Sequence, residues 1–143
     1  MMGPTNYTDI FDDFIRGKPL FMEANMTSHT ILVVDDSRVS RMLVRAIIDH
    51  ADKQAEIIEA SNGEEALTKT ETAQITIAIL DLNMPGMDGL VLATKLIERF
   101  PNAKMGLLTA NIQDMVRQKA NALGITFIPK PITEEKILGF IYG

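Results

Sequence analysis

Short apolar runs alternate with amphipathic segments from residue 30 to residue 143. The runs are short enough to be strands, and in each following segment apolar residues recur every three or four positions, which is typical of a helix. The predicted strands cover residues 31–34, 56–60, 75–80, 104–108 and 126–128, and the predicted helices cover residues 37–49, 61–72, 90–100, 112–123 and 133–142. This alternation predicts an α/β domain with a (βα)5 layout, in which helices cover both faces of a parallel sheet.

Two of the predicted helices have a clear apolar stripe. In the helix over residues 90–100, the residues expected to point inward are Leu92, Ala93, Leu96 and Ile97. In the helix over residues 37–49, the stripe consists of Val39, Met42, Leu43, Ala46 and Ile47, and the residues off it are Arg38, Arg41 and Arg45. Such stripes ordinarily face the core of a globular domain.

Residues 1–29 do not continue the alternation, and we expect them to form an N-terminal extension. Apolar spacings of three and four predict a short amphipathic helix over residues 8–16. Its apolar face would consist of Tyr7, Ile10, Phe11, Phe14 and Ile15. Two interpretations stay open. The helix docks on its own domain or on a partner and is followed by a linker over residues 20–29, or the extension is a poorly ordered leader with Met22 and Met26 as alternative start sites.

The composition narrows the class of protein. The 143 residues carry a net charge of −5 without a basic cluster, which argues against direct binding to nucleic acid. No apolar run approaches the roughly 18 residues that a membrane-spanning helix needs. The chain has no cysteine, which excludes disulfides and thiolate-bound metals. Because no secretory signal is visible either, we expect a cytoplasmic protein without membrane contact.

Charged and polar side chains directly follow the predicted strands. They are Asp35 and Asp36 after the first strand, Asp81 after the third, Thr109 after the fourth and Lys130 after the fifth. In an open parallel sheet the carboxyl ends of the strands meet at one edge, and ligands bind there at the topological switch point. We therefore expect these side chains to share one rim.

Such a set of side chains is suited to phosphoryl chemistry. Three neighbouring carboxylates need a cation or a proton to coexist, and oxygen ligands without His or Cys favour Mg²⁺. Lys130 and Thr109 can bind phosphoryl oxygens, and an aspartate that attacks phosphorus forms an aspartyl phosphate. Each residue alone has a simpler explanation, as a helix cap or a turn. The combination at successive strand ends points to a site.

Four segments carry a resemblance to a known family. They are ILVVDDS at 31–37, DLNMPGMDG at 81–89, LLTAN at 107–111 and FIPKP at 127–131. In order and spacing they resemble the receiver domain of two-component response regulators, including the single-domain receivers of chemotaxis, over residues 30–143. The resemblance implies a flavodoxin-like, doubly wound fold with a five-stranded parallel sheet of order 2-1-3-4-5.

The resemblance also implies roles for the residues at the rim. Asp81 would be the phosphoacceptor, and Lys130 would bind the phosphoryl oxygens. Mg²⁺ would be bound directly by Asp36, by Asp81 and by the backbone carbonyl of Asn83. Asp35 would act mainly through metal-bound water.

Two further residues would form the conformational switch of such a domain. Thr109 would move toward the phosphoryl group, and Phe127, at the family's switch aromatic position, would follow it. Since Phe127 lacks the hydroxyl of a tyrosine, this switch would work by packing alone. The resemblance further implies a cis peptide bond between Lys130 and Pro131, which X-Pro bonds accommodate readily.

The function implied is that of a signalling module. It would accept a phosphoryl group from a histidine kinase or a histidine phosphotransfer protein and act on an unknown downstream protein. It would catalyse only its own phosphorylation and dephosphorylation. Because the sequence ends at Gly143, we expect no DNA-binding or enzymatic output domain. The last helix has more apolar residues than one buried stripe needs, namely Ile137, Leu138, Phe140, Ile141 and Tyr142. We therefore expect a contact surface there, for helix 8–16 or for a homodimer through the last two helices or the N-terminal helix.

Three alternatives belong to other classes of protein. The first is a scaffold or interaction protein that keeps the site without being phosphorylated. The second is a true hydrolase, but phosphatases with an aspartate nucleophile commonly carry an acid two residues downstream, and Asn83 cannot donate a carboxyl proton. The third is a flavodoxin-like cofactor binder, which the acids in place of a glycine-rich loop after the first strand disfavour.

Overall fold

The computed structural model describes residues 28–110 and 113–143. The helix predicted over residues 8–16 lies outside these described residues, as does Asn111. Within the described part of the chain, no helix is long and apolar enough to cross a bilayer.

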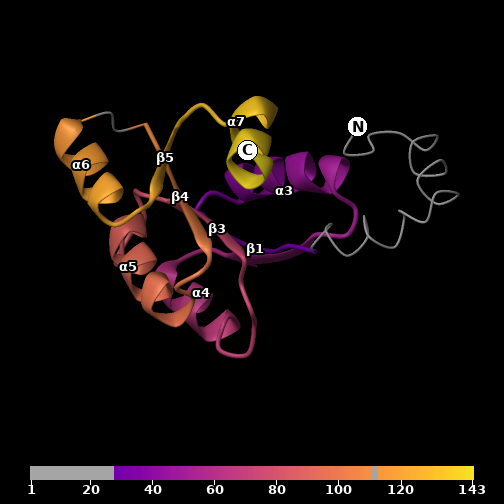
Figure 1. Cartoon of the computed structure of the whole chain (residues 1–143), viewed down its shortest axis with the longest axis horizontal. Helices are drawn as coiled ribbons and strands as arrows, with labels where there is room; N and C mark the ends of the chain where they lie inside the picture. The colour runs from indigo at the N-terminus through magenta and orange to yellow at the C-terminus, as the bar shows by residue number, and fades with distance from the viewer. Residues whose placement is uncertain (1–27, 111–112) are drawn as a thin grey trace, which may run out of the picture.

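The described residues form one parallel sheet, as predicted. Its strands are β1 Thr30–Val34, β2 Glu56–Ala60, β3 Ile77–Asp81, β4 Lys104–Thr109 and β5 Thr126–Pro129. The strand order is β2-β1-β3-β4-β5, which confirms the predicted order 2-1-3-4-5 (Figure 1). Val34 at the end of β1 pairs with Ala60 of β2 and Leu80 of β3, so the carboxyl ends of these strands are level. The sheet therefore brings the segments after β1 and β3 to one edge.

Each strand is followed by a helix, and most helices begin at a side-chain cap. They are α3 Arg38–Ala51, α4 Gly63–Lys69, α5 Gly89–Arg99, α6 Asp114–Ala122 and α7 Glu134–Tyr142. The caps of α3, α4, α5 and α7 accept a backbone N–H from the first turn and are Ser37, Asn62, Asp88 and Thr133. The α4 helix ends three residues earlier than predicted, and the Thr70 hydroxyl donates to the Ala66 carbonyl there at 2.8 Å.

The helices form a layer on each face of the sheet (Figure 1). Alternate residues of β1 belong to different cores, because successive side chains of a strand point to opposite faces. Leu32 and Val34 pack in the core under α4, α5 and α6, whereas Ile31 and Val33 pack in the core under α3 and α7. Burial on both faces explains why β1 and β3 are nearly continuous apolar runs.

The orientation of α3 differs from the one that its apolar stripe predicts. Of the predicted stripe only Ile47 is buried, and the helix meets the sheet through Val44, Ile47 and Ile48. The other stripe residues are exposed and are Val39, Met42, Leu43 and Ala46. The helix is apolar around much of its circumference, so spacing alone does not select the buried side. The Arg41 guanidinium contributes to the choice, since it donates to the Asp35 carbonyl at 2.7 Å and turns that side toward the sheet edge.

The apolar surplus predicted for α7 is mostly accounted for within the chain. Ile137, Phe140 and Ile141 are buried, and Leu138 packs against the same core. Tyr142 remains half exposed, but its hydroxyl donates to Asp52 at 2.6 Å. The predicted contact surface on α7 therefore reduces to Tyr142, because the helix packs against α3 as well as against the sheet.

Candidate functional site

Three aspartates from the ends of β1 and β3 lie together at the carboxyl edge of the sheet. One carboxylate oxygen from each of Asp35, Asp36 and Asp81 lies within 4.8 Å of the others, and we call these residues the acid cluster. Asp35 and Asp81 are buried, whereas Asp36 is exposed. The juxtaposition predicted from the strand ends is confirmed for these three residues.

The carboxylate of Asp35 is held firmly on one side only. Its Oδ1 accepts from the Ser37 backbone N–H at 2.9 Å, and its own N–H donates to the Ala60 carbonyl at 3.2 Å. Its Oδ2 is buried and has no hydrogen-bond partner. Across residues 28–110 and 113–143, it is the only buried side-chain nitrogen or oxygen atom without one. Buried polar atoms are normally paired, so this oxygen is suited to a cation or to water bound to one.

Lys130 pairs with Asp81 and partly compensates its charge. The Nζ atom of Lys130 lies 3.0 Å from Oδ1 of Asp81. The backbone places the lysine, because the Lys130 N–H donates to the Thr109 carbonyl at 2.9 Å. The peptide bond between Lys130 and Pro131 is cis, as predicted.

Burial and mutual repulsion raise the pKa of two carboxyls of the acid cluster. For Asp81 desolvation is the largest cause and nearby Asp36 adds to it, while Lys130 and a hydrogen bond from the Asn83 backbone N–H lower the pKa in part. For Asp35 desolvation again raises the pKa most, the Ser37 N–H opposes it, and the charge of Asp81 adds to the rise. Without a cation, the ionised acid cluster is electrostatically unfavourable.

Gly89 allows α5 to begin directly beside the acid cluster. A Cβ at this position would lie 2.2 Å from the Asp81 carbonyl oxygen. The Gly89 N–H donates to the Leu82 carbonyl at 2.9 Å, which closes the turn after β3. The Asp-Gly pair at 88–89 therefore combines a helix cap with a close backbone approach that only glycine permits.

The two residues predicted to form the switch lie on β4 and β5, the two strands beyond β3 in the sheet. Thr109 ends β4 and is fully buried, and Phe127 in β5 is half buried. The Arg117 guanidinium of α6 lies over the Phe127 ring, 4.7 Å from its centroid. This cation–π contact was not predicted, because nothing in the spacing of Arg117 distinguishes it from the other exposed charges of that helix.

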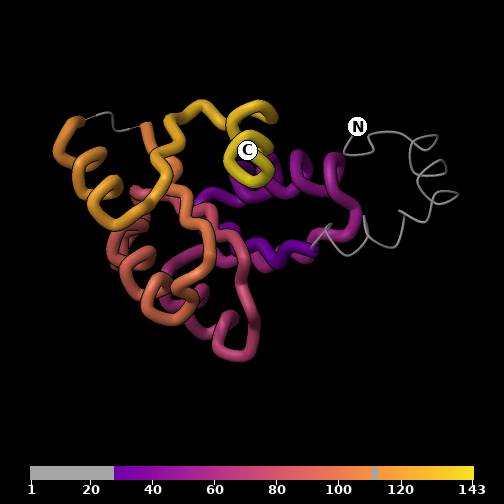
Figure 2. The backbone as a smooth tube through the Cα atoms, viewed as in Figure 1, coloured from indigo at the N-terminus to yellow at the C-terminus, as the bar shows by residue number. Residues whose placement is uncertain are grey.

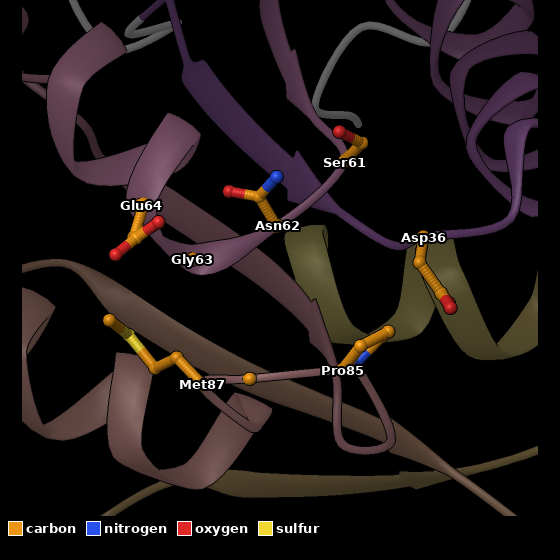
Figure 3. A pocket seen from close by; sticks show the side chains of 8 residues that line it. Asp36, Ser61, Asn62, Gly63, Glu64, Pro85 and Met87 are labelled. Carbon is orange, nitrogen blue, oxygen red and sulfur yellow. The ribbon is translucent and has the colours of Figure 1, made fainter.

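A pocket of about 310 Å³ opens next to the acid cluster and shares Asp36 with it. Figure 3 shows its walls, which come from the segment after β2 and from the turn after β3. Gly63 and Met87 meet across it, since a Cβ at Gly63 would lie 2.6 Å from the Met87 sulfur. Glu64 adds a second acid to the lining. The pocket gives Asp36 direct access to solvent.

Two residues that support the acid cluster were not predicted. Ser37 binds Asp35 through its backbone, so its side-chain identity gives no signal of this contact. Arg41 joins the carbonyl of Asp35 to the carboxylate of Glu59, which it contacts at 3.2 Å. An arginine one turn after an Asp-Asp-Ser sequence is the available signal, although its spacing also suits the polar side of the helix.

Comparison with known proteins agrees with this geometry. The model of the response regulator receiver domain matches residues 31–142. The chain is 32% identical over 109 residues to the chemotaxis protein CheY of Listeria monocytogenes, a match that covers 76% of this chain and 91% of that protein.

Solved structures show the same architecture. The Vibrio cholerae chemotaxis protein CheY4 superposes with a TM-score of 0.72 at 29% identity, covering 80% of this chain and 97% of that one. A Borrelia burgdorferi chain from a CheX–CheY complex with BeF3 and Mg²⁺ superposes with a TM-score of 0.70 at 30% identity, covering 79% of this chain and 86% of that one. The chain belongs to the family of response regulator receiver domains and has the fold of CheY-like signalling modules.

Proposed function

We propose that Asp81 is the phosphoacceptor of this receiver domain. The observation that carries the proposal is the position of its buried carboxylate, which lies 3.0 Å from the Lys130 ammonium and has an oxygen within 4.8 Å of an oxygen from each of two further carboxylates. An ammonium and a metal cation beside a reacting carboxylate would offset the charge of an incoming phosphoryl group. We accordingly propose that residues 30–143 form the receiver domain and that residues 1–29 are an extension.

We also propose that the acid cluster binds Mg²⁺. The unpaired buried Oδ2 of Asp35, together with donors that are all hard oxygens, fits this ion. Asp36, Asp81 and the backbone carbonyl of Asn83 would hold it directly, with Asp35 acting through metal-bound water. When bound, Mg²⁺ would neutralise carboxylate charge and bind phosphoryl oxygens.

The phosphoryl group would come from a phosphohistidine of a kinase or phosphotransfer protein. A carboxylate oxygen of Asp81 would attack phosphorus, a new P–O bond would form, and the P–N bond would break. The imidazole nitrogen of the donor would keep the electron pair and take up a proton. Lys130 would stabilise the charge on the phosphoryl oxygens. The pocket beside Asp36 would keep this side of the acid cluster open to the donor.

Thr109 and Phe127 would report the phosphorylated state. Thr109 ends the strand next to β3, and its carbonyl already holds the Lys130 backbone. Movement of Thr109 toward the phosphoryl group would change the space available to Phe127. Arg117 would respond through its contact with that ring. Output would then be a change of surface around α6, β5 and α7, read by another protein or by a second copy of the chain.

The observations favour a phosphorylated signalling module over the alternatives. The acid cluster and the Lys130 contact are both intact, which speaks against a scaffold that no longer uses them. Asn83 in place of an acid speaks against turnover of foreign phosphoesters. We expect the module to catalyse only its own phosphorylation and dephosphorylation. The absence of cysteine and of a basic cluster supports a cytoplasmic place of action and a protein, not nucleic acid, as its target.

Beryllofluoride, an analogue of the phosphoryl group, tests this proposal. With Mg²⁺ present, we expect backbone amide shifts in NMR spectra at Asp81, Thr109 and Phe127. The Asp81→Asn variant should show none of these shifts, and Asp49→Asn, a change on the distant end of α3, should behave as the wild type. Wild-type spectra that stay unchanged with Mg²⁺ and beryllofluoride would contradict the proposal.

A further inference from the structure

The solvent side of α3 carries large apolar side chains that the fold leaves uncovered. Val39, Met42 and Leu43 are 75%, 56% and 45% exposed, and Ala46 is exposed beside them. Their spacing of i, i+3, i+4 and i+7 places them in one stripe along the helix, which we call the α3 outer face. A contiguous apolar stripe on the surface of a small domain ordinarily marks a site of contact.

Arginines border one side of the α3 outer face. Arg38 and Arg45 are four and three positions from Met42, so both lie on turns next to it. Arg45 is paired with Asp49 at 3.5 Å and with Glu59 at 2.9 Å. Arg38 is exposed and has no charged partner among the described residues. An occupant of this face should therefore be apolar on one side and acidic along its border.

We propose that residues 8–16 of this same chain dock on the α3 outer face as an amphipathic helix. The apolar residues of this segment, together with Tyr7 just before it, repeat the spacing of the α3 outer face at i, i+3, i+4 and i+7. They are Tyr7, Ile10, Phe11 and Phe14. The acids between them are Asp9, Asp12 and Asp13. Two helices with matching apolar stripes and opposite border charges are complementary in both packing and electrostatics.

The segment is tethered within reach of this face. The chain enters the domain at the end where α3 stops, because the His29 carbonyl accepts from Glu56 at the start of β2 at 2.9 Å (Figure 2). The His29 ring also contacts the ring of Tyr142, whose hydroxyl binds Asp52 just after α3. Residues 17–27 can span about 35 Å when extended, whereas the 14 residues of α3 span about 21 Å. The tether therefore reaches every position of the α3 outer face.

Tethering also favours this occupant over a second copy or an unrelated partner. A short linker presents a segment to its own domain at an effective concentration of roughly millimolar. A contact made by a few apolar side chains and one charged border is too weak to hold two free molecules together. At this effective concentration it is sufficient to keep the tethered segment docked. The docked helix would lie beside the acid cluster, because Val39 follows Asp36 by three residues.

Engineered cysteine pairs test the contact, since the natural chain has no cysteine. The test pair is Phe14→Cys with Leu43→Cys, and the control pair is Phe14→Cys with Val91→Cys. Leu43 and Val91 are 45% and 46% exposed, and each lies eight residues before the last residue of its helix, α3 or α5, on opposite faces of the sheet. In the full-length chain, equilibration with a glutathione buffer gives the effective concentration of each pair from its intramolecular disulfide.

We expect an effective concentration at least tenfold higher for the Leu43 pair than for the Val91 pair. Adding Phe11→Asp should reduce the Leu43 value to that of the Val91 pair, because a charge is then placed in the apolar contact. Equal values for the two pairs would overturn the proposal. Disulfides that form only between chains would also overturn it and would assign the α3 outer face to a second copy.

Discussion

The ammonium of Lys130 lies 3.0 Å from Oδ1 of Asp81, and the same lysine is bound through its backbone N–H to the carbonyl of Thr109. One residue therefore joins the proposed phosphoacceptor to the proposed sensor of its state. The side chain of Lys130 is 30% exposed, whereas that of Asp81 is 4% exposed. The contact thus lies where an incoming phosphoryl group can replace the carboxylate oxygen as the partner of the lysine.

Replacing Lys130 should show its contribution to charge stabilisation during phosphorylation separately from any contribution to folding. We expect Lys130→Met to lower the rate of phosphorylation by a small acyl phosphate about 10²–10³-fold, the usual effect of losing one group that stabilises developing charge. Quantification of phosphoprotein over time measures this rate. Lys53→Met is a suitable control, because Lys53 is exposed and lies between the end of α3 and the start of β2, at the opposite edge of the sheet from the acid cluster. Equal losses in both variants would contradict a specific role for Lys130.

The unpaired oxygen of Asp35 predicts a change in stability that depends on pH. In a chelating buffer at pH 7, Asp35→Asn should raise the free energy of unfolding by about 1 kcal/mol, because it removes a buried charge that burial and Asp81 disfavour. The folded-state pKa of Asp35 is raised, so the wild type gains relative stability as pH falls through that pKa toward the ordinary value near 3.8. The stability advantage of Asp35→Asn over the wild type should therefore shrink as pH falls through this range.

Urea unfolding at several pH values measures this difference. Glu98→Gln serves as the control, since Glu98 is an exposed acid on α5. Mg²⁺ should stabilise the wild type more than Asp35→Asn. An advantage of Asp35→Asn that stays constant with pH, or an equal response of both proteins to Mg²⁺, would contradict this explanation of the acid cluster.

The contact of Arg117 with Phe127 predicts an energetic coupling between α6 and β5. A double-mutant cycle with Arg117→Met and Phe127→Leu should give a coupling of about 0.5–1 kcal/mol, the range of a partly exposed cation–π contact. The same cycle with Lys119→Met should give a coupling near zero, although Lys119 lies on the same helix. Thermal or urea unfolding supplies the values, and equal coupling in the two cycles would refute the assignment.

Two glycines predict opposite effects of the same substitution. Gly106→Ala should destabilise the domain by about 1–3 kcal/mol, because a Cβ there would lie 2.7 Å from Ile128 and 2.8 Å from the ring of Phe140. Gly139→Ala should stabilise it by up to about 1 kcal/mol, since nothing lies within 4 Å of its Cβ position and alanine favours the helix. Calorimetry of both variants checks the pair, and a shift of the same sign in both would be inconsistent with this packing.

Local patterns in the sequence predict the strands and the rim of the sheet well, whereas the strand order follows from the resemblance to receiver domains. Continuous apolar runs identify β1 and β3 as buried strands, and a parallel sheet necessarily brings their ends together. Asp35, Asp36 and Asp81 therefore meet as predicted. The boundaries shift by a few residues where capping groups such as Thr70 close a helix early.

The orientation of α3 could not be predicted in the same way. Val39 and Val44 are equally apolar, and spacing assigns them to different sides of the helix without saying which side meets the sheet. The structure selects Val44 and Ile48, with Arg41 between the carbonyl of Asp35 and Glu59. The contact between Arg41 and Glu59 joins two residues of ordinary type from different elements. The pattern of apolar and polar residues in a single sequence does not predict such a contact.

The most direct test of the account is to locate the phosphoryl group itself. Wild-type protein and Asp81→Asn are incubated with Mg²⁺ and a small acyl phosphate, and their intact masses are compared before peptide mapping of the modified protein. We expect one phosphoryl group on the wild type, mapped to Asp81 and lost when Mg²⁺ is chelated beforehand, and none on Asp81→Asn. A wild type that stays unmodified, or an equal gain of mass in both proteins, would contradict the central claim.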